Sequence, residues 1–283
     1  MIKIITDSTC DIPQSLVEQY DIGVVPLRLT IDGQQYRDGV DIHPKEFYAR
    51  LASNHTTMHT SQATENDFKE VYDHAADTGA DELLVMTLSS VLSGTYNSAS
   101  QAAQDYRIPV TVVDTHATSM GMGWQVLAAA RARETGGQTV QGILENINRV
   151  RKKISQMVGM ETLEYMQRGG RLGAAAKWAG SLLRIKPIVA FDHRDSRVEP
   201  VGLARSYRAL VDLLHRQFFS RFKGKKLLRV AVLHGDAADT AQEMAEKIRA
   251  EYDPLELLVN STNTAMGIHT GPGAVGLCGY SED

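Results

Sequence analysis

Short apolar runs alternate with amphipathic segments along the first half of the chain. Residues 2–6, 24–31, 83–88 and 110–113 have the length and the β-branched residues that are typical of strands. Apolar residues recur at helical spacing in the segments 13–20, 44–51, 64–76, 94–106, 122–135 and 139–154. This alternation predicts an α/β fold, in which helices cover a sheet.

The second half repeats the alternation more loosely. Strands are expected at residues 157–160, 187–191, 197–203, 227–233, 255–259 and 274–278. Helices are expected at residues 163–168, 172–183, 207–222 and 237–252. We therefore predict two α/β domains, residues 1–155 and 156–283, with the boundary after the long basic helix that ends near residue 154.

Composition and charge narrow the class of protein. The chain has 283 residues, of which 43% are hydrophobic and 23% are charged, as in soluble globular proteins. A net charge of −4 argues against a nucleic-acid-binding protein. Two cysteines do not make a disulfide framework, and no Cys/His spacing indicates a metal site. Without a leader or a long apolar run, we expect a cytoplasmic protein with no membrane span.

A hydroxyl-rich turn follows the apolar run at residues 83–88. Ser89, Ser90, Ser93 and Thr95 precede or begin a helix that starts near Gly94. The first amides of a helix lack internal partners, and the helix dipole is positive at that end. The turn therefore predicts an anion site for a carboxylate or a phosphate. The alternative is that Ser93 only caps the helix.

Other polar turns are expected at the same edge of the sheet. They are residues 6–9, 60–62, 114–123 and 267–273, each near the end of an expected strand or the start of a helix. The pair Gly169-Gly170 allows a sharp turn that leaves Arg171 at the start of the next helix. Arg171 and His269 could supply positive charge to an anion. A surface ion pair and a structural histidine are the alternatives for these two residues.

These segments together resemble the DegV family of fatty-acid-binding proteins. The resemblance rests on residues 6–9 (TDST), 60–62 (TSQ), 88–99 (LSSVLSGTYNSA), 112–115 (VVDT), 161–172 and 269–273 (HTGPG). It implies two α/β domains with a lipid tunnel between them. It also implies a fatty acid carboxylate near Thr60, Ser61, Ser93 and Gly94, with Arg171 and His269 in the same neighbourhood. Two departures are Ala63, where the family usually has Pro, and Cys10, where Ala is common.

The resemblance further implies a non-catalytic role with no cofactor. Some members are acyl-carrying subunits of a bacterial fatty acid kinase, whose catalytic subunit is related to dihydroxyacetone kinases. This chain has no phosphate-binding loop of the ATPase type, so a partner would supply ATP. Arg205 is the candidate contact with that partner. Candidates for the lining of the tunnel are Ala174, Ala175, Ala176, Ala179, Leu182, Leu183, Ile185, Met120, Met122 and Met266.

Two other functions are compatible with the same residues. A Ser/His hydrolase could use Ser93 as nucleophile and His269 as base, although Ser93 lacks the Gly-x-Ser-x-Gly elbow of α/β-hydrolases. A phosphate- or sugar-binding protein would need a polar cavity in place of an apolar tunnel.

Overall fold

A parallel sheet in the first half of the chain is buried on both faces. The structure is a computed structural model that describes residues 1–51, 57–178 and 185–283. In spatial order the strands are β2 (Gly23–Val25), β1 (Ile2–Asp7), β6 (Glu82–Thr87) and β7 (Val110–Asp114). One face packs on α3 (Glu65–Asp77) and α4 (Thr95–Ala102), and the other packs on α5 (Met120–Glu134), with α6 (Val140–Arg151) beside α5. Continuous apolar runs are what such a two-sided environment requires.

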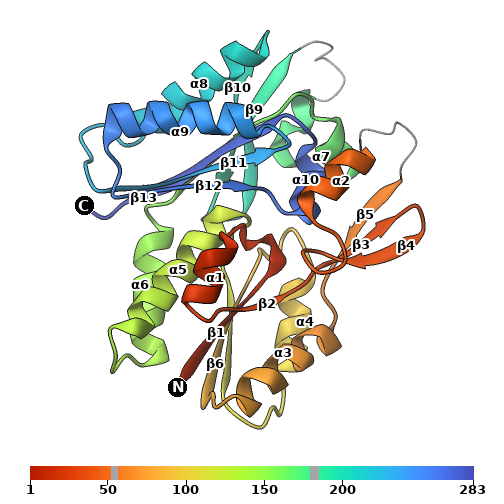
Figure 1. Cartoon of the computed structure of the whole chain (residues 1–283), viewed down its shortest axis with the longest axis vertical. Helices are drawn as coiled ribbons and strands as arrows, with labels where there is room; N and C mark the ends of the chain where they lie inside the picture. Colours follow the sequence, from red (N-terminus) through yellow and green to blue (C-terminus); the bar gives the residue numbers. More distant parts are fainter. Residues whose placement is uncertain (52–56, 179–184) are drawn as a thin grey trace.

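A small antiparallel sheet stands beside the parallel one (Figure 1). Its strands are β4 (Gln34–Arg37), β3 (Arg28–Ile31) and β5 (Met58–Ser61), and α1 (Gln14–Gln19), α2 (Pro44–Leu51) and the 3₁₀ turn η1 (Ser8–Cys10) complete this half. The predicted segment 24–31 is thus two strands, because Pro26 lacks the N–H that a continuing ladder would need. The predicted turn at Thr60 and Ser61 is also wrong, because both residues belong to β5.

The second half forms a six-stranded sheet of mixed direction. In spatial order its strands are β10 (Arg197–Ala204), β9 (Lys186–Asp192), β8 (Ser155–Gly159), β13 (Ala274–Ser281), β11 (Leu228–Gly235) and β12 (Glu256–Ser261). One face packs on α8 (Tyr207–Ser220) and α9 (Ala238–Tyr252). The remaining elements are α7 (Glu164–Arg168), η2 (Gly173–Trp178) and α10 (Thr264–Thr270). The expected helix 172–183 is a 3₁₀ helix over 173–178, and its last residues lie outside the described part.

Helix α5 lies between the sheets of the two domains (Figure 1). All residues from 120 to 130 are buried, and Trp124 donates a hydrogen bond across the interface to the carbonyl of Cys278 (3.2 Å). Ile4 on β1 and Ala231 on β11 belong to the same apolar cluster as this helix. The boundary near residue 155 remains our proposal. Among the described helices, none is both long and apolar enough to cross a bilayer.

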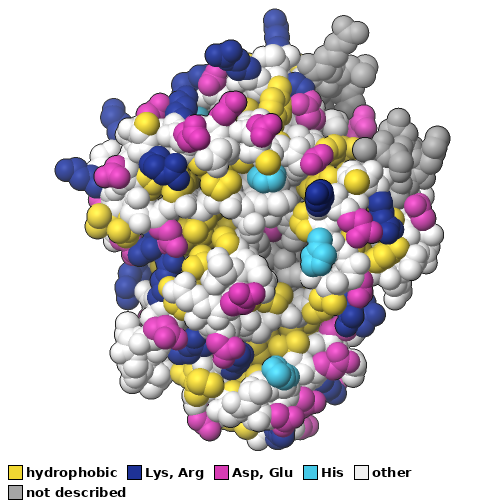
Figure 2. All heavy atoms as spheres, viewed as in Figure 1, with side chains coloured by type: hydrophobic (Ala, Val, Ile, Leu, Met, Phe, Trp, Pro, Cys, Tyr) yellow, Lys and Arg dark blue, Asp and Glu magenta, His cyan; other side chains and the backbone are white. Residues whose placement is uncertain are grey.

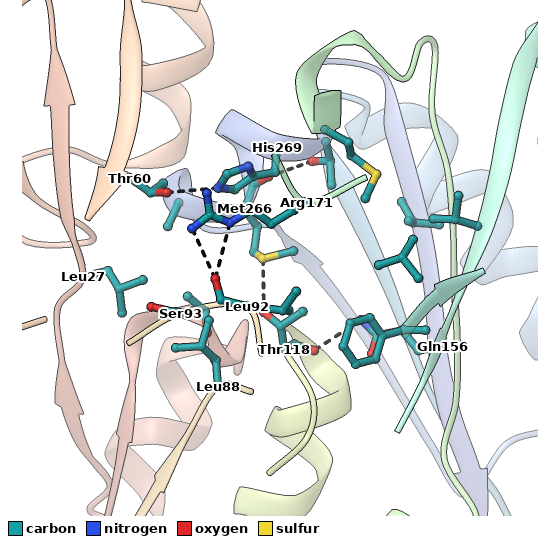
Figure 3. Close-up of a pocket in the computed structure, with 18 of the residues that line it drawn as sticks. Leu27, Thr60, Leu88, Leu92, Ser93, Thr118, Gln156, Arg171, Met266 and His269 are labelled. Carbon is teal, nitrogen blue, oxygen red and sulfur yellow. Dashed lines mark hydrogen bonds between the residues drawn. The ribbon is translucent and has the colours of Figure 1, made fainter. Parts of the chain in front are cut away.

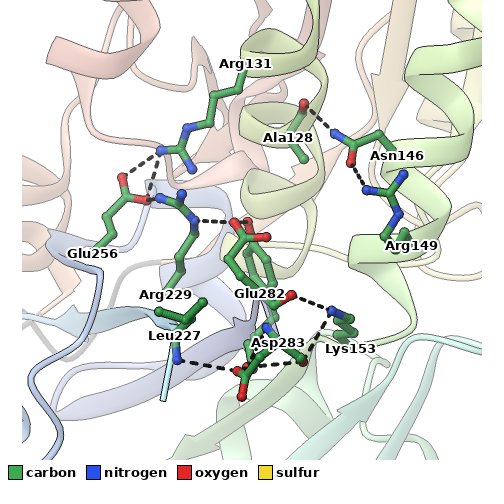
Figure 4. Close-up of polar contacts among 12 residues, drawn as sticks. Ala128, Arg131, Asn146, Arg149, Lys153, Leu227, Arg229, Glu256, Glu282 and Asp283 are labelled. Carbon is green, nitrogen blue, oxygen red and sulfur yellow. Dashed lines mark hydrogen bonds and ion pairs between the residues drawn. The ribbon is translucent and has the colours of Figure 1, made fainter. Parts of the chain in front are cut away.

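A network of charged hydrogen bonds lies at the edge of this interface (Figure 4). Arg131 on α5 donates to both carboxylate oxygens of Glu256 on β12, at 2.7 and 2.9 Å. Arg229 on β11 donates to Glu256 at 2.6 Å and to Glu282 at 2.6 Å. The side chain of Glu256 is only 17% exposed, so it separates two arginines in a partly desolvated position. Loss of its charge would leave the two cations facing each other.

We predict that Glu256→Gln lowers the free energy of unfolding by about 1–3 kcal/mol, since it removes the shared partner of two half-buried arginines. Urea denaturation at neutral pH measures this change. The exposed pair of Arg107 and Asp77 provides the control, and Asp77→Asn should cost about 0–1 kcal/mol. Equal losses in the two variants would show that the network does not stabilise the interface.

Candidate functional site

An apolar cavity lies between the two domains, where α10 approaches β5 and the turn after β6. The cavity volume is about 120 Å³, so the space is narrow. One wall is the face of β8, β9 and β10 that carries Val158, Val189, Phe191 and Val198. Val158 pairs with Val189 and Phe191 pairs with Val198, so the alternation of strand side chains places all four on one face.

The polar side chains in this part of the cavity leave one group without a partner among the described residues, the oxygen Oε1 of Gln156. Gln156 donates from Nε2 to the carbonyl of Thr118 at 3.3 Å. The hydroxyl of Thr118 donates to the sulfur of Met266 at 3.2 Å. Both contacts are visible in Figure 3. The wall therefore suits an alkyl chain better than a sugar, which would need many free hydrogen-bonding groups.

Hydroxyl, imidazole and guanidinium groups gather at one end of the cavity (Figure 3). Thr60 Oγ1 on β5 lies 3.1 Å from His269 Nε2 on α10. The guanidinium of Arg171 donates to the carbonyl of Leu92 at 3.3 and 3.4 Å and to that of Gly169 at 2.5 Å. Because Arg171 is exposed, this end faces solvent. We call it the headgroup end.

The structure brings five of the six expected site residues to the cavity: Thr60, Ser61, Ser93, Arg171 and His269. Successive strand residues point to opposite faces, so Ser61 does not direct its hydroxyl to the same side as Thr60. Gly94, the sixth, is the N-cap of α4 and is covered by Gln62. A Cβ atom at Gly94 would lie 1.9 Å from Gln62 Oε1, so a side chain at this position would require Gln62 to move.

Of the four hydroxyls in the predicted anion turn, only Ser93 borders the cavity. Ser93 Oγ lies 2.9 Å from Thr95 Oγ1 and accepts a longer bond from the Thr95 amide. Ser89 instead binds Ser196 of the second domain at 2.7 Å. The Ser90 side chain is exposed. The turn thus contributes one hydroxyl to the site and one contact to the interface.

His269 lies on a helix, α10, where the sequence predicted a turn. Burial, and then the nearby cation of Arg171, lower the pKa of His269 to about 4. The imidazole is therefore neutral at pH 7 in the ligand-free protein, and a positive charge on His269 stays a prediction for the protein with a carboxylate bound. Its Nδ1 has no hydrogen-bond partner among the described residues and faces Gly169, where a Cβ atom would lie 2.1 Å away.

Arg205 stands apart from the cavity. It is exposed between β10 and α8 and makes no hydrogen bond or ion pair with the described residues. Ala204, next to it, pairs with Lys186, whereas the cavity residue Val198 pairs with Phe191. Arg205 therefore follows the end of β10 that is farther from Val198.

The expected tail-lining residues are mostly elsewhere. Met266 borders the cavity, but Met120 and Met122 pack in the core around α5. The remaining described candidates do not line the cavity, namely Ala174, Ala175, Ala176 and Ile185. Ala179, Leu182 and Leu183 lie outside the described residues. The strand residues that do line it lie in the predicted strands 187–191 and 197–203, but the first of these is continuously apolar, so its sequence does not show which residues face the cavity.

The arrangement favours binding over catalysis. His269 Nε2 contacts Thr60, and Ser93 contacts Thr95, so Ser93 and His269 do not form the hydrogen-bonded pair that activates a nucleophile. Within the described ranges, no three His, Cys, Asp or Glu side chains are placed to hold a metal ion.

We predict that His269→Gln reduces the loss of stability on acidification. A histidine with a folded pKa of about 4 and an unfolded pKa near 6.5 stabilises the fold above pH 6.5, and this contribution is lost as the pH falls to 4. Urea unfolding at pH 4.5 and pH 7 checks the sign, with the exposed His59→Gln as control. A pH dependence identical to that of the wild type would contradict the assignment.

Known proteins that resemble this chain over nearly its whole length agree with the α/β fold described above. The family model described as "Uncharacterised protein, DegV family" matches residues 1–282. A DegV domain-containing protein of Deinococcus radiodurans is 33% identical over 282 residues, covering 98% of this chain and 97% of the relative. One of Staphylococcus aureus is 32% identical over 274 residues, covering 97% of this chain and 96% of the relative.

Solved structures show the same architecture. A DegV family protein from Thermus thermophilus, described by its fatty acid binding, has a TM-score of 0.91 and 36% identity, with 99% of both chains covered. DegV of Bacillus subtilis, described as a fatty acid binding protein, has a TM-score of 0.90 and 27% identity, also with 99% of both chains covered. On its sequence and its two-domain α/β fold, this chain belongs to the DegV family.

Proposed function

We propose that this protein binds a long-chain fatty acid, with its tail in the cavity and its carboxylate at the headgroup end. The observation that carries the proposal is the cavity itself, a narrow apolar space that ends in hydroxyl, imidazole and guanidinium groups. The fatty acid binding described for the Thermus thermophilus and Bacillus subtilis relatives supports the same ligand class.

The two ends of a fatty acid match the two ends of the cavity. Burial of a methylene contributes about 0.8 kcal/mol, so about fourteen of them give roughly 11 kcal/mol before the costs of association. The carboxylate needs donors, and Thr60, Ser93 and Arg171 are the residues that we assign to it, because Ser61 faces away from Thr60 and Gln62 covers Gly94. A proton on His269 Nε2 would be donated to Thr60 Oγ1, which would leave the Thr60 hydroxyl proton free for the carboxylate.

The protein would act as a carrier in the cytoplasm, without turnover of its own. By its resemblance to acyl-carrying subunits, we propose that it presents the carboxylate to a fatty acid kinase catalytic subunit related to dihydroxyacetone kinases. The exposure of Arg171 at the headgroup end supports access from outside. On the face shown in Figure 2, cationic and anionic side chains are interspersed and do not form one large patch of a single sign.

Native mass spectrometry of the purified protein, followed by lipid extraction, tests the ligand. We expect about one long-chain fatty acid per chain, held without a covalent bond. A serine adduct or ester turnover would support the hydrolase alternative instead. Absence of any fatty acid, together with no uptake of added palmitate or oleate, would contradict the proposal.

We predict that Ser93→Ala and Thr60→Ala each weaken palmitate binding by about 10- to 100-fold, as expected for a hydrogen bond to a charged group worth ~1.5–3 kcal/mol. Isothermal titration of delipidated protein measures the affinity. Ser100→Ala is the matched control, because Ser100 bonds its own helix α4 away from the cavity. Wild-type affinity in both variants would place the carboxylate elsewhere.

We predict that Arg205→Glu abolishes acyl-phosphate formation with a reconstituted kinase subunit while the fatty acid content stays normal. The reason is that a charge reversal on an unpartnered surface arginine disturbs docking and not the cavity. Arg208→Glu, on the exposed part of α8 next to it, is the comparison. An intact coupled reaction in Arg205→Glu would remove this residue from the partner contact.

A further inference from the structure

Helix α10 begins in contact with the domain to which it does not belong. Its chain segment follows β12 of the second domain, yet its first turn is bonded to two carboxylates of the first domain. Farther along, α10 carries Met266 and His269 into the cavity. The start of this helix therefore connects the interface between the domains with the headgroup end.

Asp11 binds the residue that caps the helix. Its Oδ1 accepts hydrogen bonds from the amide of Asn263 at 2.8 Å and from Asn263 Nδ2 at 2.6 Å. Asn263 in turn accepts from the amide of Met266 at 2.8 Å. The other oxygen of Asp11 accepts from Ser119 at the start of α5. Asp11 is only 4% exposed, so these bonds are protected from water.

Asp38 binds the next residue of the helix. It lies between β4 and α2, is 2% exposed, and accepts from the amide of Thr264 at 3.1 Å. Its second oxygen accepts from Ser8 at 2.8 Å, and Ser8 accepts from the amide of Leu27, which borders the cavity. Both carboxylates thus satisfy main-chain or capping donors of α10 from outside its own domain.

Burial of these two carboxylates in their charged form costs free energy. Burial raises the pKa of Asp11 to about 7 and that of Asp38 to about 6. A neutral capping side chain would satisfy the same amides without the burial of two acidic groups. A carboxylate accepts several hydrogen bonds in fixed directions, so it can define the position of the helix relative to the first domain.

We propose that Asp11 and Asp38 are positioning residues for ligand binding: they fix α10 so that His269 meets Thr60 at the headgroup end. The 3.1 Å contact between His269 and Thr60 joins the two domains, and it depends on where α10 sits. This inference rests on the proposed function, because it assigns the affected step to the carboxylate of the fatty acid.

The test compares palmitate with hexadecanol, which has the same tail and no carboxylate. Delipidated Asp38→Asn and Asp11→Asn should lose about tenfold more affinity for palmitate than for hexadecanol. Asp67→Asn is the matched control, since Asp67 is a buried carboxylate that caps α3, which does not border the cavity. In this control the ratio of the two affinities should equal that of the wild type.

A second variant avoids changing a buried acid. Thr264→Pro removes the amide that Asp38 binds, together with the threonine side chain, and proline is favoured at this first helical position. It should change the affinity ratio in the same direction, whereas Thr264→Val, which keeps the amide, should not. The ring resonances of His269 in the ligand-free protein should also shift in Thr264→Pro.

Equal losses for both ligands in the Asp38 and Thr264→Pro variants would overturn the positioning role. If the wild type binds neither ligand, the proposed function fails. In that case only the His269 resonances test whether the contact with Asp38 fixes the position of α10. Unchanged resonances in Thr264→Pro would overturn that inference.

Discussion

The packing of α5 against sheets of both domains is the contact on which the rest of the structure depends. Residues 120–130 are buried on every side, although a surface helix would have a polar face. This helix joins the facing sides of the two sheets in one apolar cluster. The relative position of β5, α10 and β8 follows from it, and so does the cavity that these elements enclose.

The headgroup end combines one cation at the solvent boundary with neutral groups farther in. Arg171 is exposed, so its charge can remain hydrated when the cavity is empty. His269 is buried and therefore neutral in the ligand-free protein. A carboxylate placed between them would exchange water for hydroxyl donors and would meet one full positive charge on entry. This balance suits a ligand that is held reversibly.

Local signals in the sequence predicted much of the fold. Helix α2 has the predicted bounds, and Thr64 caps α3 in a reciprocal arrangement with Asp67, as its position before an acidic first turn suggested. The motifs also indicated the residues that gather at the headgroup end. The sequence did not reveal α10, because its seven residues include glycine and give no helical period. Nor did it reveal β4 and β5, or the pairing of β3 with β5, which joins Leu29 to Thr60 across a long separation in sequence.

The position of β13 has a consequence for how the chain folds during synthesis. Residues 274–281 form the strand between β8 and β11, in the middle of the second sheet. The second sheet therefore cannot be completed until these residues have left the ribosome, although β8 is made about 120 residues earlier. Until then Trp124 on α5 also lacks its partners, the carbonyl of Cys278 and the ring of Tyr280. Until then, the apolar face of α5 that packs on the second sheet is exposed to solvent. This exposed apolar surface is what a chaperone would bind during synthesis.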